Sequence, residues 1–135
     1  MEWLQLWKFH LNPPQELPGR TPEVIERYQQ HRENLASKGQ TLTDFILTSI
    51  FDQEALNCGW TFVENDFPYR LAPGIQHFVF WISPQNRLST DQKLEQLNLE
   101  LIRRGYSLDR VVYYQNLPHL QSIPCIEHYQ VFISS

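Results

Sequence analysis

The sequence predicts an α+β fold in a single domain, with a mainly antiparallel sheet and flanking helices. Its 135 residues suit one compact core, because a second core would leave each half too small for burial to outweigh chain entropy. Apolar residues recur at helical spacing in 21–51 and 89–105, and in strand-like runs in 60–82 and 110–133. An order of helices, strands, one helix and further strands is typical of α+β domains.

The composition limits the classes of function. A 41% share of hydrophobic residues with only 19% charged residues is typical of a chain that folds. The formal charge of -4 and the isoelectric point near 5.7 argue against a general nucleic-acid-binding protein, whose affinity depends on lysine and arginine. No apolar run is long enough to span a bilayer and the first residues lack the pattern of a secretion signal, so we expect a cytoplasmic protein with no membrane partner. We expect Cys58 and Cys125, which have no metal-type spacing, to be reduced and buried.

The first twenty residues differ from the rest of the domain. Trp3, Leu4 and Trp7 recur at helical spacing, which predicts a short helix that docks its two tryptophans on the body. The prolines and glycine of 12–20 predict an extended connector over the surface. We therefore divide the domain into this helix and connector, residues 1–20, and a body, residues 21–135.

The body begins with two predicted helices. Thr21 and Pro22 are typical of an N-cap and a first helical residue, and the helix should end at Gly39. Its inward face should carry four residues at helical spacing: Val24, Tyr28, His31 and Leu35. Thr41 and Asp44 have the spacing of a capping box, and predict a second, shorter helix that ends near Phe51.

Strands and one more helix complete the prediction. We expect strands at 60–63 and 75–82, joined through a turn at Pro73 and Gly74, and the second of these should be central because both its faces are apolar. Ser89 or Thr90 should cap a helix that ends at Gly105. Its buried stripe should comprise Leu94, Leu97, Leu101 and Ile102. Strands at 110–114 and 126–133 should follow, with a turn at 116–118 between them.

Two polar turns, 65–69 and 116–122, each precede an apolar strand that carries a histidine. His128 shares a strand face with Gln130 and follows the turn that carries Asn116, Gln121 and Ser122. Histidine acts as a nucleophile or base only when a neighbour holds its other ring nitrogen, so polar neighbours are a chemical requirement. We take His128 as the candidate catalytic residue, and the alternative is a core histidine bonded to a backbone carbonyl.

Other polar residues have weaker patterns. His77 lies beside Val79 and Trp81, which favours a structural role, and Asn65 and Asp66 could orient a substrate or cap their turn. No pair of histidines or carboxylates has the spacing of a metal site, and no glycine-rich phosphate loop, Gly-x-Ser-x-Gly or Cys-x-x-Cys motif occurs. We therefore expect no metal and no cofactor. Arginines that could meet an anionic ligand are Arg20, Arg70 and Arg110.

Four motifs together resemble a known family. They are Asn65-Asp66-Phe67-Pro68-Tyr69, Ile75-Gln76-His77-Phe78-Val79-Phe80-Trp81, Asn116-Leu117-Pro118-His119-Leu120-Gln121-Ser122-Ile123 and Ile126-Glu127-His128-Tyr129-Gln130-Val131, with Arg20, Pro22 and Tyr28 upstream. They are similar to N-D-W-P-Y-G, I-x-H-L-V-V-W, N-W-x-x-L-Q-S-V and V-E-H-F-H-V of a largely fungal family of domains of unknown function. Three positions depart from the family pattern: Arg70 replaces its glycine, Leu117 its second tryptophan and Gln130 its second histidine. The resemblance implies aminoacyl-tRNA-dependent cyclodipeptide synthesis as one activity, with tRNA as the one nucleic-acid partner.

The segment around His128 also resembles the histidine-triad superfamily. Gln121-Ser122-Ile123-Pro124 and Ile126-x-His128-x-Gln130 are similar to its Q-S-V-x-H-x-H-x-H strand, with His128 at the middle, nucleophilic position. Gln130 stands where the galactose-1-phosphate uridylyltransferase branch has glutamine, and Ile126 departs from the first histidine. This likeness implies a histidine-triad-like topology and a covalent bond between His128 and a phosphoryl or similar centre.

Three hypotheses follow. The first is a transferase or hydrolase that acts on a phosphorylated or otherwise activated small substrate through His128. The second is a non-catalytic module that binds a small anionic ligand, and the third is the aminoacyl-tRNA-dependent transferase. The expected substrate-binding residues are Asn65, Asp66, Tyr69, Arg70, His77, Asn116, Gln121, Ser122 and Gln130.

Overall fold

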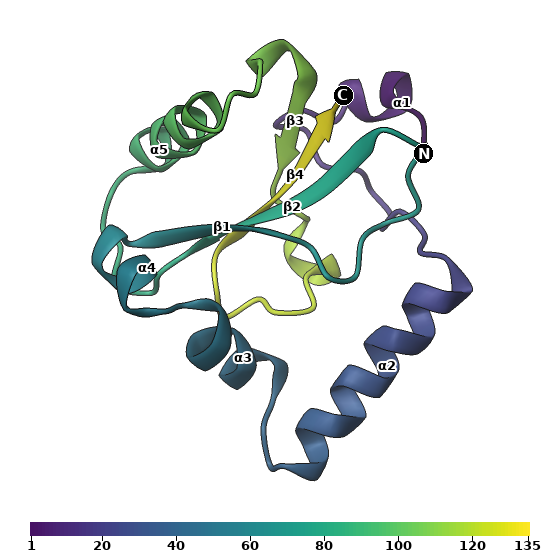
Figure 1. Cartoon of the computed structure of the whole chain (residues 1–135), viewed down its shortest axis with the longest axis vertical. Coiled ribbons are helices and arrows are strands. Elements are labelled where there is room, and N and C mark those ends of the chain that lie inside the picture. Colours follow the sequence, from purple (N-terminus) through teal and green to yellow (C-terminus); the bar gives the residue numbers. More distant parts are fainter.

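The computed structural model describes residues 1–135 and contains a four-stranded antiparallel sheet with helices on both faces (Figure 1). The α+β prediction is therefore confirmed. The strand order is β1-β2-β4-β3. In chain order the elements are α1 (Trp3–Trp7), α2 (Pro22–Ser37), α3 (Leu42–Phe45), the π-helical turn η1 (Ile46–Ile50), α4 (Gln53–Cys58), β1 (Trp60–Glu64), β2 (Ile75–Ile82), α5 (Thr90–Arg103), the 3-10 turn η2 (Leu108–Arg110), β3 (Val111–Tyr114), the 3-10 turn η3 (Pro118–Leu120) and β4 (His128–Ser134).

The two central strands, β2 and β4, set which side chains share a face. They pair in a register that runs from Ile75 opposite Ser134 to Trp81 opposite His128. Because side chains alternate along a strand, this register places His77, Trp81, His128 and Gln130 on one face. The prediction that β2 is a central strand, apolar on both faces, is confirmed.

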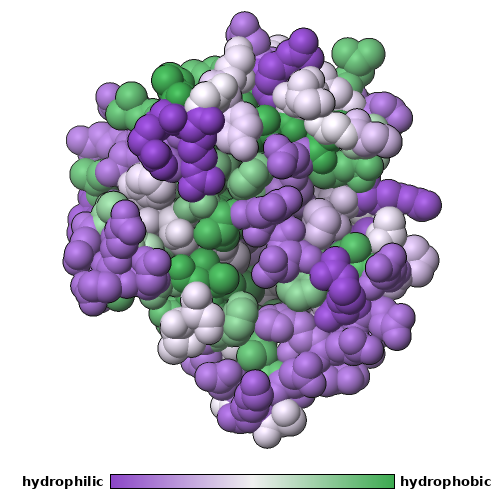
Figure 2. All heavy atoms as spheres, viewed as in Figure 1, coloured by the Kyte–Doolittle hydropathy of each residue, from purple (hydrophilic) through white to green (hydrophobic).

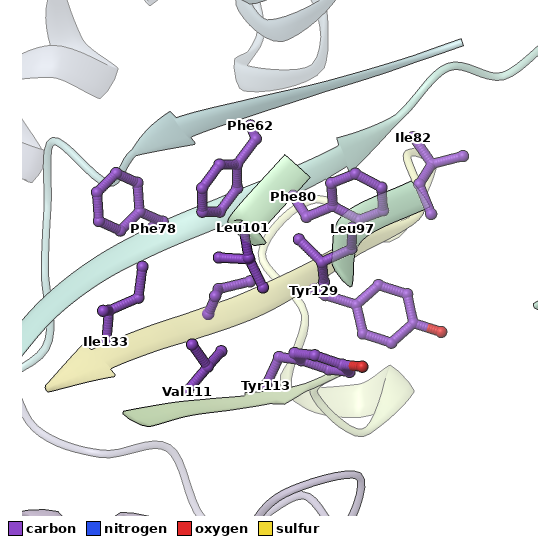
Figure 3. Close-up of a cluster of buried hydrophobic side chains, with 11 residues drawn as sticks. Phe62, Phe78, Phe80, Ile82, Leu97, Leu101, Val111, Tyr113, Tyr129 and Ile133 are labelled. Atoms are coloured by element: carbon purple, nitrogen blue, oxygen red, sulfur yellow. The ribbon is translucent and has the colours of Figure 1, made fainter. Parts of the chain in front are cut away.

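The opposite face of the sheet holds the largest apolar cluster, which α5 covers. Figure 3 shows Leu97 and Leu101 of α5 among the aromatic and aliphatic side chains of the strands. Phe62 of β1 and Phe78 of β2 stack within it, with ring centroids 4.9 Å apart. Burial of this apolar surface holds α5 on the sheet.

The face that carries the histidines is covered by two smaller clusters. In one, Ile46, Phe51 and Ala55, from η1 to α4, pack against Val79 and Trp81 of β2. In the other, Leu6 of α1 and Tyr69 pack against side chains of β3 and β4. These side chains are Val112, Tyr114 and Phe132. The polar residues of this face lie between the two clusters.

The predicted helix starts have the expected caps. The Thr21 hydroxyl accepts a hydrogen bond from the Val24 amide at 3.3 Å, and Thr41 and Asp44 form a reciprocal capping box. Ser89 caps α5 in the same way: its hydroxyl accepts from the Gln92 amide, and Oε1 of Gln92 accepts from the Ser89 amide. These side chains satisfy amides that have no partner inside the helix.

Several expectations were wrong. In α1, Leu6 is buried and Trp3 packs half-buried against the same cluster, as expected for Trp3, but Trp7 is 54% exposed and Leu4 86% exposed, because the body contacts the side of the helix that carries Trp3 and Leu6. Ile102 of α5 is 55% exposed, so it lies outside the buried stripe.

The thiols and one helix also differ from prediction. Both Cys58 and Cys125 are free but exposed rather than buried, because each lies in a connecting segment or at a helix end. Helix α4 was not predicted, although Asp52 accepts a bond from the Ala55 amide at its start and Gly59 ends it with a φ of 88°.

Helix α2 projects from the body in Figure 1, and its surface in the same view is largely hydrophilic in Figure 2. Only Leu35 of this helix is buried. The two chain ends lie near the turn before β2, where Ala72 donates to the Met1 carbonyl and Ser135 donates to the Gly74 carbonyl. None of the helices combines the length and the apolar composition that a membrane crossing requires.

Replacing Leu97 with alanine should lower the free energy of unfolding by about 2–5 kcal/mol, because Leu97 of α5 is fully buried against the sheet and truncation leaves a cavity. Leu99→Ala is the matched control, since Leu99 lies on the same helix and is 59% exposed; its effect should stay within about 0.5 kcal/mol. Urea unfolding followed by circular dichroism measures both. Equal effects of the two variants would contradict the packing of α5 described above.

Candidate functional site

A pocket of about 110 Å³ opens on the face of the sheet that carries the histidines. Strands β1, β2 and β4 form its floor, helices α2 and α3 with η1 form one wall, and the segments 64–69 and 116–123 close it. Both polar turns singled out from the sequence therefore meet at one site. The connector before α2 also reaches it, through Leu17 and Arg20.

The structure places most of the predicted site residues at this pocket. Those that line it are Asn65, Asp66, Tyr69, Asn116, Ser122, His128 and Gln130. Three predicted residues do not line it. Arg70 is exposed outside the pocket, His77 lies behind Gln130, and the Gln121 side chain donates to the Asn116 carbonyl at 2.8 Å.

His128 is held by one ring nitrogen only. Its Nδ1 lies 2.7 Å from the carbonyl oxygen of Ile126, so Nδ1 carries the proton and donates it. Nε2 is then unprotonated, and no protein group bonds to it. Burial lowers the pKa of His128, while the Ile126 carbonyl and Glu127 act in the opposite direction. The bond to a backbone carbonyl that was expected of a core histidine is thus present, and it leaves Nε2 of His128 as an unprotonated base at the pocket.

His77 is fully engaged within the protein. Its Nδ1 accepts a hydrogen bond from the Tyr69 amide at 3.2 Å, and its Nε2 lies 2.6 Å from Oε1 of Gln130. The ring also stacks on Phe132, at 4.5 Å between centroids. Burial lowers the pKa of His77 to about 3, only partly offset by the bond to Gln130. His77 is therefore neutral, with its proton on Nε2.

Asn65 and Arg20 are joined through the backbone of Phe67. Oδ1 of Asn65 accepts from the Phe67 amide at 2.8 Å, as Asx residues do in turns, and Nε of Arg20 donates to the Phe67 carbonyl at 2.9 Å. The Arg20 guanidinium lies over the rings of Tyr28 and Tyr69, and no carboxylate is within ion-pair distance of it. The terminal nitrogens of Arg20 remain available to a ligand.

A second polar group lies beside Tyr69. Nδ2 of Asn116 donates to the Tyr69 hydroxyl at 3.1 Å, while Oδ1 of Asn116 and the Tyr114 hydroxyl are buried without partners. Burial raises the pKa of both tyrosines, so both are protonated. An unpaired buried acceptor costs about 1–3 kcal/mol, which a ligand or water that donates to Asn116 would recover.

The pocket has an apolar wall that was not anticipated as part of a site. Phe45, Ile46 and Ile50 form it together with Trp81, and the rings of His31 and Phe45 meet edge to face at 4.6 Å. One indication of this wall is present in the sequence. Tyr28 and His31 were expected on the inward face of α2, yet that face meets the pocket rather than a closed core.

The fold and the pocket define a single-domain α+β protein with an amphipathic pocket where two sequence motifs meet. The chain belongs to a family of proteins of unknown function, DUF3605, whose model matches residues 14–134. No curated protein matches the chain. Its structure is similar to one described as "Crystal Structure of HTC1", with a TM-score of 0.64, 19% identity, and coverage of 99% of this chain and 85% of the other. At this identity the likeness shows a shared fold, and the histidine-triad likeness stays a prediction.

No group of three or more histidine, cysteine, aspartate or glutamate side chains lies close enough together to hold a metal ion. The chemistry available at the pocket is that of the imidazoles of His128 and His31, side-chain amides, the Arg20 guanidinium, tyrosine hydroxyls, and the carboxylates of Glu64 and Asp66.

Acid should destabilise the protein through its neutral histidines. The pKa of His77 is near 3 in the folded state and about 6.5 unfolded, so between these values the unfolded chain binds the extra proton. The contribution of neutral His77 to the free energy of unfolding is complete above pH 6.5. It is lost at about 1.4 kcal/mol per pH unit as the pH falls, and His128, whose pKa is also lowered, makes the loss steeper.

Urea unfolding across this pH range measures the slope. The His77→Gln side chain can still accept from the Tyr69 amide and donate to Gln130. This variant should reduce the slope by up to about 1.4 kcal/mol per pH unit, the value for one proton taken up on unfolding. His119→Gln, the same change at an exposed residue outside the pocket, is the matched control. An unchanged slope in His77→Gln would mean that His77 takes up its proton as readily in the folded protein as in the unfolded chain, which would contradict its lowered pKa.

Proposed function

We propose that the pocket is the active site of a transferase or hydrolase acting on a small substrate with a phosphoryl or activated acyl group, and that His128 is its nucleophile or general base. The observation that carries the proposal is the bond from Nδ1 of His128 to the Ile126 carbonyl, which leaves an unprotonated Nε2 at the pocket.

As a nucleophile, Nε2 of His128 would form a bond to phosphorus or to the acyl carbon while the bond to the leaving group breaks, and the leaving group departs with the electron pair. The ring then carries a positive charge that the Ile126 carbonyl, already accepting from Nδ1, stabilises. Water or an acceptor hydroxyl then attacks the same centre, loses its proton to solvent or a base, and releases neutral His128. As a base, Nε2 would instead take the proton of the attacking hydroxyl.

The lowered pKa of His128 supports this role at neutral and mildly acidic pH. A histidine with an ordinary pKa of about 6.5 is partly protonated near pH 6, and a protonated ring can neither attack nor accept a proton. Burial keeps the ring of His128 neutral to lower pH. The apolar wall formed by Phe45, Ile46 and Trp81 supports a substrate with an apolar portion beside the reactive group.

A non-catalytic module that binds a small anionic ligand is the second candidate. The half-buried guanidinium of Arg20, which has no carboxylate partner, favours it. Gln130 also favours it, because a glutamine cannot transfer protons. The two candidates share the pocket and differ in whether a covalent bond to His128 forms.

His128→Ala should abolish covalent labelling while the protein stays folded. Intact-mass spectrometry after incubation with nucleotides, nucleotide sugars and charged tRNA detects the adduct, and peptide mapping should place it on His128. Charged tRNA is included because its aminoacyl ester is an activated acyl group. The control is His119→Ala, at an exposed histidine, which should label as the wild type does.

An adduct that persists in His128→Ala would refute the role of His128. Tight binding measured by calorimetry without any adduct in the wild type, and with turnover absent, would establish the binding module instead. A gel shift by charged tRNA separates the aminoacyl-tRNA-dependent activity from both.

A further inference from the structure

We infer that Gln130 and Asn65 form a two-donor subsite for an oxyanion of the substrate, a carboxylate or phosphoryl oxygen, and that His77 is the positioning residue that fixes the direction of the Gln130 donor. The inference rests on the proposed function in that the pocket takes a small substrate. Beyond the proposed function, it identifies the substrate atoms that the polar end of the pocket recognises.

A backbone amide fixes the direction of the hydrogen bonds around His77, because a backbone N–H can only donate. The Tyr69 amide can only donate, so Nδ1 of His77, 3.2 Å away, must accept. A neutral imidazole that accepts at one nitrogen carries its proton on the other. Nε2 of His77 is therefore a donor, and the atom of Gln130 that lies 2.6 Å from it must be the oxygen.

The orientation of Gln130 follows from that bond. With Oε1 directed at His77, the amide nitrogen Nε2 of Gln130 is left as the group that faces the pocket, and no protein acceptor bonds to it. The strand register supports the geometry: His77 is opposite Phe132, so Gln130 is its diagonal neighbour on the same face. Gln130 thus presents a donor, and its position two residues from His128 places that donor on the face that carries the reactive nitrogen.

Asn65 is fixed by an independent backbone amide. Its Oδ1 accepts from the Phe67 amide at 2.8 Å, so its Nδ2 must point the other way. Nδ2 lies 3.4 Å from Nε2 of His77, which carries a proton and cannot accept. Both hydrogens of this amide therefore remain for a ligand. Asn65 and Gln130, which both contact the same histidine nitrogen, thus each have an amide donor without a protein acceptor.

The surrounding charges favour an anion over a neutral acceptor. Arg20, half-buried and bonded to the Phe67 carbonyl, adds a positive charge to the same end of the pocket. The carboxylates that line the pocket, Glu64 and Asp66, are exposed, so water and salt screen them more strongly than the interior donors. Hydrogen-bond donors that are preorganised in a partly buried site stabilise an oxyanion without any rearrangement of the protein.

Nuclear magnetic resonance of the imidazole nitrogens tests the positioning step without any ligand. We expect opposite neutral tautomers in the wild type, with the proton on Nε2 in His77 and on Nδ1 in His128. A proton on Nδ1 of His77 would reverse Gln130 and overturn the inference. This readout reports on proton position, which a merely space-filling role for His77 would not fix.

Titration with inorganic phosphate and, separately, with acetate tests the subsite. Either anion should shift the side-chain amide signals of Asn65 and Gln130, and the stronger of the two identifies a phosphoryl or a carboxylate group. Gln130→Met removes the donor at similar size, and Asn65→Asp keeps the acceptor for Phe67 while removing the donor. Each should weaken binding about tenfold or more, the loss expected for a hydrogen bond to a charged group.

Gln76→Met is the matched control, because Gln76 is exposed on β2 and its side chain lies on the opposite face of the sheet; it should bind as the wild type does. If neither anion binds, or if Gln130→Met binds like the wild type, the subsite is refuted. Labelling of His128 in that case would leave the proposed reaction standing, so the two failures are distinguishable. If Gln130→Met does not fold, the tautomer measurement and Asn65→Asp decide.

Discussion

The pairing of β2 with β4 is the constraint on which the rest of the structure depends. It brings the segment after the first polar turn against the segment after the second, which lie more than fifty residues apart along the chain, as the bond between His77 and Gln130 shows. A slip of one residue would move His128 and Gln130 to the face covered by α5 and expose their apolar neighbours. Because that face is filled by Phe80 and Val131 among others, the register is strongly determined.

The two faces of the sheet have different kinds of cover, and this difference creates the site. On one face a single long helix, α5, closes a continuous apolar cluster. On the other, short elements supply two separate clusters, and polar residues of the strands lie between them. Helix α2 projects from the body (Figure 1), and the pocket lies between this helix, α3 with η1, and the strands. An interior position with hydrogen-bonded polar groups beside an apolar wall can bind a ligand that a closed core cannot.

Most of the fold could be predicted from the sequence because its signals are local. Caps such as Thr21 and Ser89, and the alternation along β2, depend on residues only a few positions apart. The pairing of His77 with Gln130 could not be predicted, because the two residues lie more than fifty positions apart along the chain. His77 was expected to have a structural role, and it is held by Gln130 and the Tyr69 amide. For His128 a bond to a backbone carbonyl was one of the two alternatives, and the Ile126 carbonyl, two residues away, is that partner.

Glutamine at position 130 has a physical advantage in this arrangement. The residue there must accept from Nε2 of His77 and donate into the pocket, and an amide does both with separate atoms. A histidine, which the resembled family pattern has at this position, could do both only as one neutral tautomer, and on protonation it would set a donor against a donor. Gln130 does not titrate, so its direction depends only on the neutrality of His77. Burial maintains that neutrality down to a pH near 3.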